Sequence, residues 1–270
     1  MPAWVVIGAS RGIGLEFVRQ LASNPDTVVV AVVRSKQTAV HLVPLAGPNV
    51  HVFEADLCDR ESLKAAAAET AKVTDGSVDV LINNGAKTGG EHYFTTMNDY
   101  DGIEDAVDQE FMDAYRVNVL GVMWTTLAFI PLLRAGETKK IINISSSAGD
   151  LDFVQRIKSR TMVAYSCDKA GLNMLNAKFA NQYRDEGFIC VSFSPGIVNT
   201  EETTPGKPGE LPPGFNQALK AISAGYPEWT PIAYTPQESV SKMLDTVARL
   251  RPEDNGQFMS EKGTKNMYKD

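Results

Sequence analysis

Tyr165 and Lys169 stand four residues apart at the start of a segment with a helical pattern. Residues at this spacing share one face of a helix. A free tyrosine, with a pKa of about 10, holds its proton too tightly at neutral pH. A neighbouring ammonium stabilises the phenolate and lowers that pKa, which suits a reductase because hydride transfer to a carbonyl leaves an alkoxide in need of a proton. A tyrosine and a lysine four residues apart are common by chance, so the pair indicates a catalytic site only when the neighbouring motifs support it.

Three consecutive serines end a strand-like run upstream of this pair, within residues 143–149 (NISSSAG). A serine hydroxyl at a strand end can donate a hydrogen bond to a substrate oxygen and stabilise developing negative charge. The residues alone do not choose among Ser145, Ser146 and Ser147. A tyrosine acid and a serine donor together indicate hydride transfer to or from a carbonyl carbon.

A glycine-rich loop, residues 8–14 (GASRGIG), lies between a strand-like run and a helical pattern. Glycines permit a tight turn and a close approach of backbone to phosphate, and the helix N-terminus offers free N–H groups to the anion. The strand-before, helix-after context gives weight to an otherwise weak triplet. The loop residues expected to bind a dinucleotide are Gly8, Ser10, Arg11, Gly12, Ile13 and Gly14.

The end of the second strand-like run indicates which dinucleotide fits. A carboxylate there would bind the adenosine ribose of NAD and repel a 2′-phosphate. This chain has Arg34 instead, and Arg11 stands in the glycine loop. Two guanidiniums suit a doubly charged phosphate through charge-assisted hydrogen bonds. The sequence therefore favours NADP(H) over NAD.

The elements that must position these residues alternate along the chain. Buried strands without polar alternation, each followed by a helical pattern, indicate a parallel sheet. The predicted strands are Trp4–Gly8, Thr27–Val33, His51–Ala55, Val78–Asn83, Lys140–Ser145 and Ile189–Ser194. The predicted helices are Gly14–Ser23, about Arg60–Val73, Glu110–Arg134 and Ala164–Asp185. The predicted fold is α/β, a single-domain doubly wound parallel sheet (Rossmann fold) over residues 1–270 with helices on both faces.

One long irregular segment, residues 199–236, follows the sixth predicted strand and carries seven prolines. Long irregular loops are often lids, and ligands of such sheets bind at the carboxyl ends of strands. We therefore expect a substrate loop or lid at about 199–236. The expected walls of a mainly apolar pocket are Leu151, Phe153, Phe215, Tyr226 and Trp229.

Taken in order, these motifs resemble those of the short-chain dehydrogenase/reductase family, from Val5 to about Phe258. The resemblance selects Ser146 among the serines and implies that Lys169 binds the nicotinamide ribose. It also implies that Asn118 bends its helix and orders a water that relays protons to the lysine, although an asparagine in such apolar company could be a satisfied core residue.

The resemblance implies further cofactor contacts. They fall on Asp56, Leu57, Asn83, Asn84, Gly85, Tyr165, Lys169, Pro195, Gly196, Val198 and Thr200. The chain departs from the family pattern at Ile7, where threonine is usual, and at Gly85-Ala86, where the two residues are exchanged. The step of 19 residues from Ser146 to Tyr165 is longer than usual, which predicts an enlarged loop at Asp150–Met162 beside the substrate.

The composition limits the partners. The net charge of −7 without a basic run disfavours nucleic acid and anionic membranes, and no apolar run approaches the length that spans a bilayer. Three scattered cysteines indicate a reducing compartment, and the three histidines lack zinc-site spacing, so no metal is expected. With a strand-like run so near residue 1, we expect a cytoplasmic protein without a secretory signal.

The expected activity is NADPH-dependent reduction of a ketone or aldehyde to an alcohol. The alternatives are an NADP-dependent alcohol dehydrogenase acting in the oxidising direction and a non-catalytic NADP(H)-sensing protein. A sensor would be expected to lose Tyr165 or Lys169, and both are present. By the same resemblance, the helices Glu110–Arg134 and Ala164–Asp185 are expected to pair two copies into a four-helix bundle, in a homodimer or homotetramer.

Overall fold

Seven parallel strands form one sheet in the order β3-β2-β1-β4-β5-β6-β7 in the computed structural model, which describes residues 1–203, 215–228 and 233–265. The strands are β1 (Ala3–Ile7), β2 (Val28–Val33), β3 (Val50–Glu54), β4 (Val80–Asn83), β5 (Lys140–Ile144), β6 (Ile189–Ser194) and β7 (Phe258–Ser260). The order reverses between β1 and β4, which is the switch point where ligands of such sheets bind. The predicted doubly wound parallel sheet is confirmed, and the three-residue strand β7 was not predicted.

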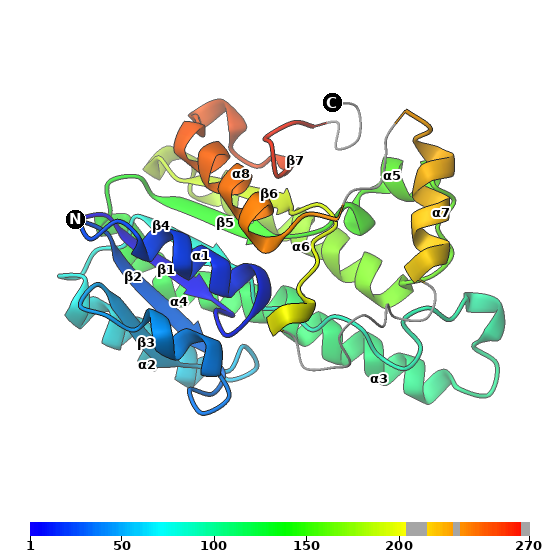
Figure 1. Ribbon diagram of the computed structural model, residues 1–270, viewed down its shortest axis with the longest axis horizontal. Coiled ribbons are helices and arrows are strands. Elements are labelled where there is room, and N and C mark those ends of the chain that lie inside the picture. Colours follow the sequence, from blue (N-terminus) through cyan, green and yellow to red (C-terminus); the bar gives the residue numbers. More distant parts are fainter. Residues whose placement is uncertain (204–214, 229–232, 266–270) are drawn as a thin grey trace.

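Helices cover both faces of the sheet (Figure 1). On one face lie α1 (Gly12–Ala22) and α8 (Pro236–Arg249), and on the other lie α2 (Arg60–Val73), α4 (Val122–Ala135) and α6 (Val163–Gln182). Every residue of β2 is buried, because helices pack on both sides of it. This double burial explains why its sequence, VVVAVV, shows no polar alternation.

The helix predicted at Glu110–Arg134 starts six residues earlier, as α3 (Glu104–Tyr115), and runs into α4 through a π-helical turn at Arg116–Gly121. The whole helix, residues 104–135, is long and apolar enough to cross a membrane by length and composition alone, unlike the sequence expectation. Half of its most apolar window is buried against the rest of the protein, which is equally typical of a core helix.

The segment 150–162 is not merely an enlarged loop, because it contains the short helix α5 (Leu151–Arg156). The carboxylate of Asp150 caps this helix by accepting a 2.7 Å hydrogen bond from the backbone of Phe153. Helix α5 packs against α7 (Phe215–Gly225), and both helices lie beyond the carboxyl edge of the sheet (Figure 1).

The pocket walls expected from the sequence need correction. Phe153 and Tyr226 stack on each other at 5.9 Å and are buried in a small apolar cluster with Ile157 and Ile222. Leu151 points outward and is 69% exposed. These side chains close the contact between α5 and α7 rather than line an open pocket. The expected irregular lid at 199–236 is also corrected in part, because its described residues include the eleven-residue helix α7. The side chain of Phe215, the residue Trp229 and residues 204–214 and 229–232 lie outside the described residues.

Candidate active site

The catalytic residues expected from the sequence meet at the carboxyl ends of β4, β5 and β6. Ser146 follows β5 and begins a tight turn that packs on the first turns of α6. The contact is close at Gly149, where an added Cβ would overlap the backbone of Lys169 and lie 2.6 Å from the nitrogen of Ala170. The absence of a side chain at this glycine lets the serine turn approach the tyrosine helix.

The side chain of Ser146 lies close enough to Tyr165 for its hydroxyl to lower the pKa of the tyrosine. The hydroxyl of Ser146 also accepts a 3.1 Å hydrogen bond from the backbone of Ala148, which orients it. The neighbouring serines are used elsewhere: the Ser145 hydroxyl lies 3.4 Å from the carbonyl of Lys169, and the Ser147 backbone donates to Ser194. The structure therefore brings Ser146, of the three serines, to the tyrosine.

Lys169 is 3% exposed and its Nζ donates a 2.8 Å hydrogen bond to the carbonyl of Ile144. Its Nζ lies 5.6 Å from the centre of the Tyr165 ring. Burial lowers the pKa of Lys169 to about 8, while the carboxylate of Asp168 raises it.

The expected lowering of the Tyr165 pKa does not occur in this structure. Burial raises the pKa of Tyr165 above its usual value of 10.0, the Ser146 hydroxyl lowers it and the charge of Asp168 raises it further. The free-energy cost of removing the phenolate from water is larger than the stabilisation that its neighbours provide. Tyr165 therefore keeps its proton at neutral pH, as a proton donor must.

Asn118 lies in the π-helical turn and is 1% exposed. Its side chain accepts a 2.8 Å hydrogen bond from the backbone of Lys87 and donates one of 2.9 Å to the carbonyl of the same residue. The same amide donates to Asp168 at 3.2 Å. A π turn is often found at functional sites, and here it presents Asn118 to the loop after β4 and to α6 at once.

The glycine loop adopts a conformation that side chains resist. Gly8 and Gly12 have φ angles of +76° and +56°, and a Cβ on Gly14 would overlap the carbonyl oxygen of Gly8. Asn84 donates a 2.9 Å hydrogen bond to that same carbonyl, which ties the loop to the end of β4. Thr200 packs on Gly12, so the segment after β6 closes over the loop.

The donor groups at this loop fit a dinucleotide phosphate. Helix α1 begins after Arg11 without a side-chain cap, and its first turn carries no acidic residue. The first N–H of the helix, at Gly12, donates a 2.8 Å hydrogen bond to the hydroxyl of Thr203, so it already faces an oxygen acceptor. These N–H groups and the positive end of the helix suit an anion.

Arg11 and Arg34 are both exposed at the carboxyl edge of the sheet, and within residues 1–203, 215–228 and 233–265 neither forms an ion pair. Glu54, at the end of the neighbouring strand β3, accepts a 2.6 Å hydrogen bond from the backbone of Lys36. Both guanidiniums are thus available to a phosphate.

The remaining expected cofactor residues serve different purposes. Asn83 is 2% exposed, and its amide donates to Thr126 and Asn143 in the core, so only its backbone could reach a cofactor. Asp56 accepts a 2.8 Å hydrogen bond from the backbone of Cys58 and stays partly exposed. Several others are partly exposed at the same edge of the sheet: Ser10, Ile13, Leu57, Gly85, Pro195, Gly196 and Val198.

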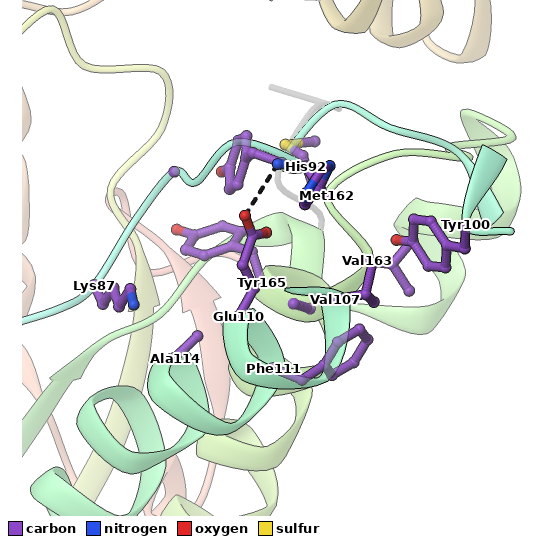
Figure 2. Close-up of a pocket in the computed structure, with 13 residues that line it drawn as sticks. Lys87, His92, Tyr100, Val107, Glu110, Phe111, Ala114, Met162, Val163 and Tyr165 are labelled. Carbon is purple, nitrogen blue, oxygen red and sulfur yellow. Dashed lines mark hydrogen bonds between the residues drawn. The ribbon is translucent and has the colours of Figure 1, made fainter. Parts of the chain in front are cut away.

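A narrow cavity borders Tyr165 on the side of α3 (Figure 2). Its walls come from the loop after β4, from α3 and from the start of α6, and include Tyr93, Tyr100, Glu110 and Met162. Figure 2 shows Glu110 pointing to the loop, where its carboxylate accepts a 3.0 Å hydrogen bond from the backbone of His92. The ring of Tyr93 lies 5.7 Å from that of Tyr165.

Sequence reasoning missed Lys87, Tyr93, Glu110 and Asp168 as neighbours of the site. Asp168 stands inside the tyrosine–lysine segment, so the motif itself could have drawn attention to it. The other three carry no local signal, because they reach the site through contacts between elements far apart in the chain. Within the described part of the chain, no three His, Cys, Asp or Glu residues are grouped to hold a metal ion.

Known proteins resemble this chain over nearly its full length. A sequence profile described as short chain dehydrogenase matches residues 3–210. The short-chain dehydrogenase/reductase atnB of Arthrinium sp is 34% identical over 98% of this chain and 99% of that protein. The short-chain dehydrogenase/reductase AacuF of Aspergillus aculeatus is 35% identical, again over 98% of this chain and 99% of that protein. The NADPH-bound carbonyl reductase from chicken fatty liver superposes with a TM-score of 0.77 and 27% identity, over 98% of this chain and 93% of that one.

Proposed function

Since this chain belongs to the short-chain dehydrogenase family of oxidoreductases, we propose that it reduces a ketone or aldehyde of moderate size to an alcohol with NADPH. The observation that carries the proposal is the position of Ser146 beside a protonated Tyr165, four residues before a buried Lys169. NADPH, when bound, supplies the hydride.

The residues of the chain do the rest of the work. Ser146 donates a hydrogen bond to the carbonyl oxygen of the substrate and stabilises its negative charge. Tyr165 gives its proton to the same oxygen, and Lys169 holds the nicotinamide ribose. Asn118 supports the path by which Tyr165 regains a proton, since it joins the loop after β4 to α6.

Support for NADPH over NADH comes from charge. The two exposed arginines at the edge of the sheet, Arg11 and Arg34, can bind a 2′-phosphate, and no carboxylate follows β2 to bind a free ribose. The related carbonyl reductase from chicken liver is described as NADPH-bound.

The proposal is tested by mixing the purified protein with NADPH and a panel of ketones and aldehydes while following the loss of NADPH absorbance. Tyr165→Phe removes the proton donor and should lower turnover at least about a hundredfold. Tyr183→Phe is the matched control, because Tyr183 is buried where α6 ends and stacks on Phe179, away from Ser146. Turnover by Tyr165→Phe at the rate of the control would contradict the assigned role.

The same assay addresses the direction of the reaction. NADP⁺ with the corresponding alcohols measures oxidation, and we expect reduction to be faster at pH 7 because Tyr165 is protonated there. A protein that binds NADPH but turns over neither class would be a sensor rather than an enzyme.

A further inference from the structure

Tyr93 lies beside the proposed proton donor but has no part in the mechanism above. The centre of its ring is 5.7 Å from that of Tyr165, and the two ring planes make an angle of 58°. Both tyrosines line the narrow cavity between the loop after β4, α3 and the start of α6. A molecule whose reacting oxygen meets the Tyr165 hydroxyl therefore has its neighbouring atoms within reach of Tyr93.

The backbone of Tyr93 is fixed to the start of α6. Its carbonyl accepts a 2.8 Å hydrogen bond from the backbone of Met162, which is held in the left-handed region at φ +57°. A methionine rarely adopts this conformation, and such strain persists only where the surrounding structure imposes it. Helix α6 begins at the next residue, so the same contact places Tyr93 and Tyr165 relative to each other.

Helix α3 holds the loop that carries Tyr93 on its other side. The carboxylate of Glu110 accepts a 3.0 Å hydrogen bond from the backbone of His92, and it packs so closely on Gly90 that an added Cβ would lie 2.8 Å from it. Figure 2 shows Glu110 reaching from α3 to this part of the loop. The rings of Phe94 and Tyr93 meet nearly at right angles, with 4.9 Å between their centres. Contacts with two helices therefore hold Tyr93 in the cavity wall.

The hydroxyl of Tyr93 has no hydrogen-bond partner within residues 1–203, 215–228 and 233–265. Burial raises the pKa of this tyrosine above its usual value of 10.0, and the nearby Tyr165 raises it further, so the hydroxyl has a proton to donate. A partly buried donor without a partner costs free energy unless an acceptor completes its hydrogen bond. The cavity beside Tyr165 is where such an acceptor can lie.

The charges around the cavity select the kind of acceptor. Lys87 lines the cavity, but its ammonium is compensated by a 2.7 Å ion pair with Asp113. Glu110 lines it too, and in the described part of the chain this carboxylate forms no ion pair. A negative substituent next to Glu110 would be repelled. The acceptor that this cavity favours is therefore a neutral oxygen, in a hydroxyl or a carbonyl group.

We propose that Tyr93 is a substrate-binding residue whose hydroxyl donates a hydrogen bond to a second, neutral oxygen near the reacting carbonyl group. The expected substrates are then hydroxyketones and dicarbonyl compounds rather than ketones with hydrocarbon chains alone. This inference rests on the proposed function, because it assigns the substrate class of that same site. Binding and turnover separate the two, since a ligand can bind at Tyr93 in a protein that does not reduce it.

The first test measures binding without cofactor, so that no reduction takes place. The probes are pairs of ketones in which a hydroxyl replaces a methyl group: 1-hydroxypropan-2-one with butan-2-one, and 4-hydroxybutan-2-one with pentan-2-one. The two pairs place the second oxygen at different distances from the carbonyl group. Saturation-transfer NMR titrations give the dissociation constants. We expect the hydroxyketone of at least one pair to bind about two- to tenfold more tightly, as one hydrogen bond between neutral groups provides. Equal affinities within both pairs would overturn the inference.

Tyr93→Phe removes the hydroxyl and keeps the ring. It should abolish the preference for the hydroxyketone and bind the matched methyl compound as wild type does. Tyr115→Phe is the control, because Tyr115 is 42% exposed on α3 and does not line the cavity. Tyr100, which also lines the cavity, gives the competing outcome. A preference that survives in Tyr93→Phe, or that disappears in Tyr100→Phe instead, would assign the contact to another group and contradict the proposal.

Variants of Glu110 test how Tyr93 is held and why the acceptor is neutral. Glu110→Ala frees the backbone of His92 and should weaken the preference, whereas Glu110→Gln keeps an oxygen that can accept the same hydrogen bond and should preserve it. The anion 4-oxopentanoate should bind wild type more weakly than pentan-2-one, and Glu110→Gln should reduce that difference. Tighter binding of 4-oxopentanoate by wild type would refute the neutral acceptor.

The last measurement is turnover with NADPH. The kcat/KM values of wild type should favour the same hydroxyketone, and Tyr93→Phe should lose that advantage while it still reduces the methyl compound. Equal kcat/KM values for the two compounds in wild type would contradict the inference. A wild-type protein that binds the hydroxyketone selectively but reduces neither compound would refute the proposed function alone.

Discussion

At the scale of the residue, burial outweighs charge in setting the pKa of Tyr165, the proposed proton donor. Lys169 lies 5.6 Å from the ring centre of Tyr165 and gives a hydrogen bond to Ile144 instead, so its ammonium does not offset the loss of water around the phenol. The result is a tyrosine that holds its proton. For a reductase this is the useful state, because the proton is delivered only after the substrate oxygen has gained negative charge.

The cofactor preference is a prediction at this scale. Arg34→Asp replaces an exposed guanidinium by a carboxylate at the end of β2. It should weaken NADPH binding by about tenfold or more, since a charge-assisted hydrogen bond contributes about 1.5–3 kcal/mol. NADH binding should weaken far less. Fluorescence titration with both cofactors measures the two affinities, and Arg184→Asp, at an exposed site after α6, controls for net charge. An equal loss for both cofactors would refute the phosphate assignment.

At the scale of the element, the geometry of the site depends on how closely α6 approaches the turn after β5. Gly149 makes that approach possible, and the π-helical turn brings Asn118 to the other side of the same helix. Tyr165 and Lys169 are therefore placed by two contacts of α6 rather than by the helix alone. An error in either contact moves both residues together.

Gly149→Ala tests the first contact. The added Cβ would overlap the backbone at Lys169, so the start of α6 must shift and Tyr165 must move relative to Ser146. Misplacement by about 1 Å can cost about a hundredfold in rate, so we expect kcat to fall by at least about tenfold. Gly171→Ala is the control on the same helix, because its Cβ would meet Val119 at an ordinary 3.4 Å. Equal rates for the two variants, both folded by circular dichroism, would contradict this account.

At the scale of the whole molecule, one sheet carries both the proposed cofactor edge and the proposed catalytic residues. Its two faces are covered by helices, and α3, α4 and α6 still expose apolar side chains: Met112 (56%), Leu127 (40%) and Met174 (62%). Scattered exposed apolar residues are normal, but these lie on the helices expected to pair two copies of the chain. We therefore retain the homodimer or homotetramer as a proposal.

Met174→Glu tests the proposed assembly. A carboxylate at the centre of a helix-to-helix interface is desolvated on association, so the variant should elute from gel filtration at about the monomer mass. Val43→Glu is the control, because Val43 is 69% exposed but lies near β3, away from these helices. Monomeric wild-type protein, or two variants that both remain oligomeric, would count against the assembly.

The sequence by itself determined the features that depend on local patterns. The buried apolar runs and the helical patterns between them predict the parallel sheet. The periodicity of apolar residues in each element, and hence its burial, depends on residues close together in the sequence. The glycine loop and the tyrosine–lysine pair could also be recognised from the sequence. A strand–turn–helix unit and an i, i+4 spacing are each formed by residues close together in the chain. On that basis most of the strands were placed within about two residues.

Only the tertiary structure decided features that depend on long-range contacts. Asn118 meets Lys87 and Asp168 across separations of 31 and 50 residues, and no periodicity records such a meeting. Phe153 does not line the expected pocket because Tyr226, 73 residues later in the chain, stacks on it. The pKa of Tyr165 rose because burial is a property of the assembled site. Local spacing named the chemical groups, and the packing of distant elements set their solvation, charge and contacts.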